Sequence, residues 1–317
     1  GLGHDAVGIR LVLHAVQRKR RAGDPVGMAA GFDKCGDVYN ALANLGFGFV
    51  EIGSLTPRPQ DGNPKPRCFR LPKDKAIINR MGINNKGAKY AIAHLQKYKR
   101  ICPVGCSITK AHDTSLADAY KDYEFSFEYM YDFVDYFVLN ISCPNVRDSK
   151  DNQSLENITH IIDKLLELRI MYDDYRPILL KISPDVTQDY LDQVLDLVLI
   201  SGLDGIIAAN TSAGREGLAT GKKTLAKIGQ GGLSGAPLFE RSLELVKYIR
   251  KKTHGHLPII ASGGIMTPQQ AMQMLDSGAS LIQVYTGFIY NGPRFVRKTN
   301  KYIAQTLIAR QLEQQQQ

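Results

Sequence analysis

Eight short apolar segments recur along the chain, and almost every one is followed by a stretch with helical spacing. The apolar segments are residues 25–30, 49–55, 102–108, 136–142, 177–183, 205–210, 257–263 and 281–287. The helical patterns cover 85–100, 115–133, 155–173, 187–201, 236–252, 267–277 and 293–311, and several open with Ser, Thr or Pro. Strands that are apolar throughout indicate a parallel sheet buried on both faces. Eight of them predict an α/β fold, a closed (β/α)8 TIM barrel. An open doubly wound sheet is disfavoured because no GxGxxG motif opens the first helix.

The barrel is expected to span residues 25–311, with two long loops rich in Gly, Pro and basic residues at 56–80 and 211–235. Before it, the apolar run VGIRLVLHAV (7–16) is followed by the basic run QRKRR (17–21). An apolar-faced helix with a basic end is typical of a segment that lies on a membrane surface. A helix packed on the domain explains the same pattern equally well. We therefore expect residues 1–24 to be an N-terminal helical, membrane-associating segment, and residues 312–317 to be the remnant of an added tag.

The charge balance restricts the class of partner. The chain has 40 Lys and Arg against 31 Asp and Glu, a net charge of +9. That balance suits nucleic acid, an anionic membrane or small anionic ligands. Apart from QRKRR, the basic residues are spread along the chain, which argues against nucleic acid. No apolar run reaches the roughly 18 residues that a membrane-spanning helix needs. The five cysteines show no CxxC spacing, so we expect buried free thiols, no metal site and a reducing compartment.

Polar side chains follow the predicted strands at their carboxyl ends, where β/α barrels place their working groups. A side-chain amide offers a donor and an acceptor together, matching the C=O/N–H edge of a planar imide or pyrimidine ring. Turn chemistry accounts for Asn84 and Asn85. Asn140 and Asn210 each end a buried apolar run, where their amides need partners. The polar residues at these ends are Ser54, Ser107, Asn140, Asn145, Asn210 and Thr211, joined by Asn79, Asn84 and Asn85 from INRMGINN (78–85).

Two lysines and three glycine-rich segments point to an anionic ligand. Lys34 ends GMAAGFDK and Lys181 lies inside PILLKIS. An ammonium at the top of an apolar barrel needs an anion, although Lys34 has Asp33 beside it and Lys181 can extend to the rim. The glycine-rich segments surround the ends of the seventh and eighth strands, where barrels commonly hold a phosphate. We therefore predict a phosphate-bearing cofactor near GQGGLSG (229–235), ASGGI (261–265) and VYTGF (284–288).

Cys143 lies in the polar loop NISCPNV (140–146), next to Pro144 and between two asparagines. Buried cysteines are mostly inert packing. Amides and nearby lysines, however, lower a thiol pKa from about 8.5 toward neutrality, close to the range in which a general base works best. The loop contains no His that would form a Cys–His pair. Proton abstraction is therefore favoured over a covalent intermediate.

Motifs such as GMAAGFDK (27–34), INRMGINN (78–85) and NISCPN (140–145) recur from about Val26 to about Ile308. On these motifs the chain resembles the dihydroorotate dehydrogenase family. The resemblance implies an FMN barrel that oxidises (S)-dihydroorotate to orotate in de novo pyrimidine (UMP) biosynthesis. In that family a loop base removes the C5 proton while the C6 hydride passes to flavin N5. The 51–71 segment and RMGINN resemble the class 2 branch, which uses quinone and lies peripherally on the cytoplasmic side of the cell membrane. The motifs are GMAAGFDK (27–34), EIGSLTPRPQDGNPKPRCFRL (51–71), INRMGINN (78–85), NISCPN (140–145), LKISPD (180–185), AANT (208–211), GGLSG (231–235) and QVYTGF (283–288).

The resemblance assigns roles residue by residue, and it gives Cys143 the position of the base. Substrate contacts fall on Lys34, Asn79, Arg80, Met81, Gly82, Ile83, Asn140, Asn145, Asn210 and Thr211. FMN contacts fall on Ala30, Gly31, Lys34, Ser54, Ser107, Asn140, Lys181, Ala209, Gly235, Gly264, Tyr285 and Thr286. The quinone tunnel is matched by Arg70 and Tyr285.

Three features depart from the class 2 pattern. Class 2 enzymes typically have a serine base, whereas Cys143 is the class 1 choice. Ser107 stands where the family has an asparagine near the flavin. The 24 residues before Pro25 are shorter than the class 2 N-terminal helical domain, so this part is truncated or gapped, or the membrane module is reduced.

Other functions fit parts of the same pattern. The cysteine favours a soluble acceptor, fumarate or NAD, whereas the 56–71 loop and RMGINN favour quinone. A barrel lyase or synthase acting on a phosphosugar would use the same glycines without a flavin. A non-enzymatic nucleotide-binding barrel is disfavoured, because Cys143 and Lys181 would have no function in it.

Overall fold

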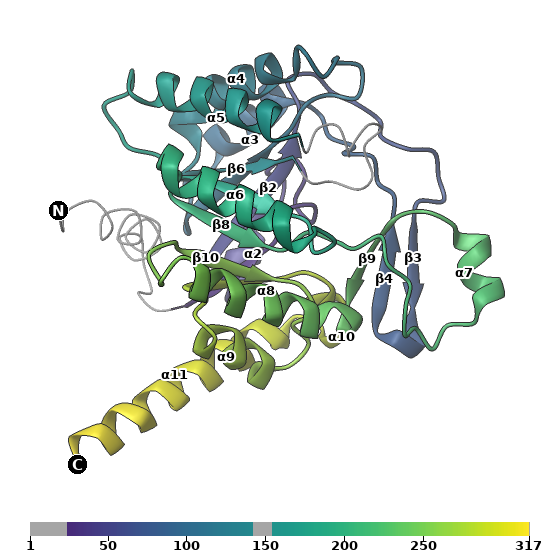
Figure 1. Ribbon diagram of the computed structural model, residues 1–317, viewed down its shortest axis with the longest axis vertical. Coiled ribbons are helices and arrows are strands. Elements are labelled where there is room, and N and C mark those ends of the chain that lie inside the picture. The colour runs from purple at the N-terminus through teal and green to yellow at the C-terminus, as the bar shows by residue number, and fades with distance from the viewer. Residues whose placement is uncertain (1–23, 142–153, 317) are drawn as a thin grey trace.

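The computed structural model describes residues 24–141 and 154–316, which form a closed parallel barrel (Figure 1). Going round the barrel, the strands follow the order β1, β11, β10, β8, β7, β6, β5 and β2, and β2 pairs with β1. Each strand lies inside one of the eight segments that the sequence predicted, so the TIM barrel is confirmed. The barrel strands are β1 (Val26–Met28), β2 (Phe49–Leu55), β5 (Val104–Ile108), β6 (Tyr136–Asn140), β7 (Ile178–Ile182), β8 (Gly205–Ala208), β10 (Ile259–Ser262) and β11 (Leu281–Val284).

Helices surround the barrel, and the seven predicted ones are all present. Ser154, Thr187 and Thr267 each accept a backbone N–H from the first turn of α5, α6 and α9, which fixes where these helices begin. The helices are α2 (Tyr39–Asn44), α3 (Ala88–Lys97), α4 (Ala119–Met130), α5 (Leu155–Arg169), α6 (Gln188–Ser201), α7 (Lys222–Ile228), α8 (Phe239–Lys252), α9 (Pro268–Asp276), α10 (Thr286–Asn291) and α11 (Arg294–Gln315), with short 3₁₀ turns η1 (Pro72–Asp74), η2 (Tyr131–Phe133) and η4 (Ala236–Leu238).

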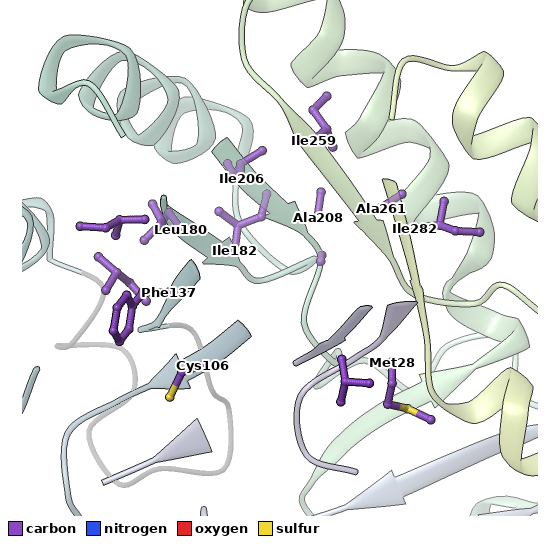
Figure 2. Close-up of a cluster of buried hydrophobic side chains, with 14 of the residues drawn as sticks. Met28, Cys106, Phe137, Leu180, Ile182, Ile206, Ala208, Ile259, Ala261 and Ile282 are labelled. Carbon is purple, nitrogen blue, oxygen red and sulfur yellow. The ribbon is translucent and has the colours of Figure 1, made fainter. Parts of the chain in front are cut away.

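Alternation along the strands separates two apolar layers. Figure 2 shows side chains of the outer layer, among them Met28, Phe137 and Ile206, which belong to the cluster that also holds the buried faces of the helices. A separate cluster fills the inside of the barrel with Phe49, Tyr136, Val138, Leu179, Ile207, Ile260 and Leu281. The interior is therefore a packed core below the carboxyl ends of the strands, which leaves those ends to form a site.

The segments 56–80 and 211–235 are not simple loops, and that expectation was wrong. They contain β3 (Cys68–Leu71), β4 (Ala76–Asn79) and β9 (Gly232–Gly235), which form an antiparallel sheet in the order β3-β4-β9. One face of this small sheet carries Leu71, Ile78 and Leu233, which cluster with Ile228 at the end of α7. Each strand has only four residues, and β4 finds its second partner far along the chain. Local sequence patterns do not reveal such a pairing.

The last helix, α11, projects from the barrel toward the C-terminus (Figure 1). It continues through Gln315, so residues 312–315, which belong to the segment predicted to be a tag remnant, extend this helix as exposed residues. The predicted N-terminal helix lies outside the described residues. Among the helices of the described part, none has both the length and the apolar character required to cross a bilayer.

Candidate functional site

A cavity lies at the carboxyl ends of the barrel strands, and the small sheet forms one of its walls. It brings together residues that are widely separated in the sequence but that were predicted to act at one site. These are Ala30, Gly31, Lys34, Ser54, Asn79, Met81, Gly82, Ile83, Asn140, Lys181, Ala209, Asn210, Thr211, Gly235, Gly264, Tyr285 and Thr286. Cys143 and Asn145 lie outside the described residues.

A chain of hydrogen bonds runs along the cavity wall and orients its amides. The Ser54 hydroxyl lies 2.7 Å from that of Ser107, and the Asn140 Nδ2 donates to Ser54 Oγ at 2.7 Å. The Asn210 Nδ2 donates to Asn140 Oδ1 at 3.2 Å. Ser107 is fully buried and does not line the cavity, so its hydroxyl acts on the site through Ser54. The buried Asn140 amide therefore has a hydrogen-bond partner for both its nitrogen and its oxygen, as its burial requires.

The floor of the cavity contains a buried ion pair that the sequence analysis missed. The Lys181 Nζ lies 3.8 Å from Glu51 Oε1, and the Gln283 Nε2 donates to Glu51 Oε2 at 2.6 Å. Lys181 was expected to require an anion or to extend to the rim of the barrel. The anion is the carboxylate of Glu51 on β2. The signal was present in the sequence, because Glu51 and Gln283 each interrupt an apolar strand. Burial raises the pKa of Glu51, and the Lys181 ammonium opposes that shift.

Lys34 also lines the cavity, and its neighbour Asp33 is engaged elsewhere. The Asp33 carboxylate accepts the backbone N–H groups of Asp37 and Val38, each at 2.8 Å. These bonds fix the turn that leads into α2. The sequence suggested that Asp33 pairs with Lys34. Its carboxylate instead accepts hydrogen bonds from the backbone of this turn.

One face of the small sheet is turned to the cavity. Cys68, Ile77, Asn79 and Ser234 all line it, and strand pairing places Ile77 opposite both Ser234 and Arg70. Opposite residues in an antiparallel pair share a face, so the exposed Arg70 lies on this face without lining the cavity. Cys68 is exposed, which makes the expectation that all thiols are buried wrong for this residue. It lies on the cavity face of β3, the edge strand of the small sheet.

Arg80 does not line the cavity, because its guanidinium turns outward. It donates to the carbonyls of Ile228 and Gln230 and lies 4.6 Å from the centre of the Phe69 ring. These contacts fasten the small sheet to the end of α7. The backbone that follows lines the cavity at Met81, Gly82 and Ile83.

Asn85 holds this cavity-lining loop in place. Its Nδ2 donates to the Ile83 carbonyl at 2.9 Å and to Thr56 Oγ1 at 2.8 Å, while Oδ1 accepts the Gly87 N–H at 2.8 Å. This is the turn role that the sequence indicated for the residue.

Tyr285 lies where β11 ends, between the cavity and Phe32. Its ring makes an edge contact with Phe32 at 5.7 Å, and burial raises the pKa of its hydroxyl to about 12. The side chain is therefore a neutral phenol at physiological pH, suited to contacting an uncharged ring system rather than to acid–base chemistry.

Gly264 is needed at the cavity wall for two reasons. Its φ is +74°, and a Cβ there would lie 2.2 Å from the backbone nitrogen of Phe239. Gly202 offers a matched control, because its φ is +76° and a Cβ there meets nothing within 4 Å. Gly202→Ala is expected to lower the free energy of unfolding by about 1–2 kcal/mol. Gly264→Ala is expected to lower the free energy of unfolding by about 1–3 kcal/mol more, because the added Cβ also overpacks against Phe239. Urea unfolding of both variants measures the difference, and equal losses would contradict the close packing.

A closed barrel with a cavity at its carboxyl ends, walled by paired amides and floored by a lysine, defines a (β/α)8 protein with a ligand-binding site at the mouth of the barrel. Residues 18–307 match the profile of the dihydroorotate dehydrogenase family. The chain belongs to that family.

Comparisons with individual proteins support this family membership. A protein of Christiangramia forsetii named dihydroorotate dehydrogenase (quinone) is 44% identical over 280 residues, 88% of this chain and 81% of that protein. A protein of the same name from Acinetobacter baylyi is 42% identical over 282 residues, 87% of this chain and 83% of that protein. The crystal structure of DHODH from Eimeria tenella in complex with ferulenol superposes with a TM-score of 0.85 at 33% identity, covering 98% of this chain and 92% of that chain.

Proposed function

We propose that this protein is a dihydroorotate dehydrogenase that oxidises (S)-dihydroorotate to orotate in de novo pyrimidine biosynthesis and passes the electrons to a quinone. The relatives named above carry that activity and that acceptor in their names. The observation that carries the proposal is a single cavity in which Lys34 and Lys181 lie with Asn79, Asn140 and Asn210.

The donor set of the cavity fits FMN. The glycine backbone at 263–264 and 235 suits an anionic phosphate, and the hydroxyls of Ser54 and Thr286 with the Lys181 ammonium suit the polar edge of a ring system. When bound, FMN supplies the hydride acceptor. We assign the FMN contacts to the residues that the family resemblance implied, with Ser107 acting through Ser54.

Substrate recognition follows from the remaining groups. The Lys34 ammonium would bind the substrate carboxylate, and the amides of Asn79, Asn140 and Asn210 would pair with the C=O/N–H edges of the ring. Because Asn140 and Asn210 are hydrogen-bonded to each other, they are oriented before the ligand arrives. Cys143, three residues after Asn140, would take the C5 proton as a thiolate.

Quinone use implies a route for a second, apolar molecule. We assign Tyr285 and Arg70 to it, since Tyr285 lines the cavity at the end of β11 and Arg70 lies on the cavity face of the small sheet. Residues 1–24 would associate with the cytoplasmic face of the cell membrane through their apolar and basic runs. The soluble acceptors fumarate and NAD remain the alternative that Cys143 favours.

Anaerobic flavin bleaching tests the proposal. The purified protein is expected to be yellow, to lose flavin absorbance when dihydroorotate is added without oxygen, and to regain it with a soluble quinone. Fumarate and NAD, added in parallel at the same concentration, should reoxidise it far more slowly. Absence of bleaching would reject the activity, and faster recovery with fumarate or NAD would reject the quinone assignment. A protein without flavin after reconstitution would favour the phosphosugar chemistry.

A further inference from the structure

Glu51 lies beneath the cavity, and neither the substrate contacts nor the cofactor contacts proposed above include it. Its side chain is completely buried inside the barrel. One carboxylate oxygen faces the Lys181 ammonium at 3.8 Å, and the other accepts the hydrogen bond from Gln283 at 2.6 Å. Lys181 and Gln283 both line the cavity, whereas Glu51 does not. Lys181 and Gln283 therefore lie between the Glu51 carboxylate and a ligand in the cavity.

The strand alternation explains why the carboxylate lies there. Phe49 belongs to the apolar cluster inside the barrel, and Glu51, two residues further along β2, points to the same side one layer higher. Leu179 and Lys181 repeat this step on β7, and Leu281 and Gln283 repeat it on β11. A polar layer of Glu51, Lys181 and Gln283 therefore separates the apolar core from the cavity.

The charge of this layer depends on Glu51. An ammonium and a carboxylate buried together are nearly neutral as a pair, whereas removing the carboxylate leaves the positive charge of the ammonium less compensated. Burial raises the pKa of Glu51, while Lys181 and the Gln283 hydrogen bond lower it. An ionised Glu51 cancels most of the charge that Lys181 would otherwise present to the cavity.

We propose that Glu51 is a positioning residue: its carboxylate, held by Gln283, fixes the Lys181 ammonium at the cavity floor and neutralises its charge there. The inference rests on the proposed function, in that the ligand above the floor is taken to be FMN. Reduced flavin carries more negative charge than oxidised flavin, so the floor charge sets how strongly the protein favours the reduced form. By neutralising Lys181, Glu51 would lower the midpoint potential of the flavin.

The Glu51→Gln variant tests this, because it preserves the shape of the side chain and removes its charge. The flavin midpoint potential of the FMN-loaded protein is measured by equilibration with a reference dye under chemical reduction, without substrate. With the Glu51 charge removed, the Lys181 ammonium should favour reduced over oxidised flavin at least tenfold more than in the parent, a positive shift of about 30 mV for a two-electron couple. Glu51→Asp retains the charge but withdraws it from Lys181, so it should shift the potential in the same direction by less.

Asp204→Asn is the matched control. Asp204 is another buried acid, paired with Arg169 at 2.6 Å, but it precedes β8 at the amino end of the barrel, away from the cavity. The Asp204→Asn variant should be less stable than the parent but should have the same flavin midpoint potential. An unchanged potential in Glu51→Gln overturns the proposal; if that variant does not fold, an unchanged potential in Glu51→Asp does so. A parent that holds no flavin overturns both this inference and the proposed function. A flavin-loaded parent that dihydroorotate does not bleach overturns the proposed function alone.

Discussion

Cys143→Ala is expected to slow flavin reduction by dihydroorotate by about 10²–10⁴-fold, the usual loss when a general base is removed. Orotate should still bind, because its predicted contacts are the lysine and amides of the cavity. Cys143→Ser should retain part of the rate but need a higher pH, since an alcohol is a far weaker acid than a thiol. Anaerobic stopped-flow measurement of flavin reduction, with orotate binding as the companion assay, separates chemistry from affinity.

Cys68→Ala is the control for this variant. Cys68 is an exposed thiol that lines the same cavity from the small sheet, and no catalytic role is assigned to it. Its removal should change the rate of flavin reduction far less than the loss of Cys143. If Cys143→Ala reduces flavin at the parent rate, the base is another group.

The barrel could be predicted because each of its strands is buried on both faces. Segments such as YFVL (136–139) and PILL (177–180) are apolar at every position, so they can be recognised without tertiary information. The carboxyl-end rule then placed Asn140, Lys181 and Asn210 at one mouth, and the structure brings them together. Strand identity and strand direction were sufficient for this part of the site.

What the sequence did not reveal depends on pairing between distant segments. The small sheet joins β4 to β9, and neither four-residue strand is distinctive by itself. The anion for Lys181 was sought in a ligand, whereas it comes from Glu51 on another strand. Ser107 was placed at the cofactor from its position in a motif, but its hydroxyl meets Ser54 instead. The last two cases require knowing which inward-facing residues of different barrel strands lie next to each other.

Asn140→Asp is expected to weaken orotate binding roughly a thousandfold at neutral pH. The substitution keeps the shape of the side chain but places a carboxylate beside an anionic ligand. Two like charges about 4 Å apart repel by about 4 kcal/mol at an effective dielectric constant of about 20, and about 1.4 kcal/mol corresponds to a factor of ten. Because Asn140 is only 8% exposed, burial should raise the pKa of the new carboxyl above that of an ordinary Asp. Its charge is present above that pKa and lost below it, so orotate affinity should recover as the pH falls.

The measurement is an orotate titration of the FMN-loaded protein, followed by flavin absorbance from neutral to mildly acidic pH. Asn40→Asp makes the same chemical change at an asparagine on α2 that does not line the cavity, where the side-chain oxygen accepts the Ile101 N–H at 3.2 Å. It should leave both the affinity and its pH dependence as in the parent, because the new charge is far from the ligand and screened by solvent. Equal orotate affinity in Asn140→Asp and the parent at neutral pH would mean that the ligand does not lie against β6, and the amide-lined cavity would then have to bind some other part of the substrate.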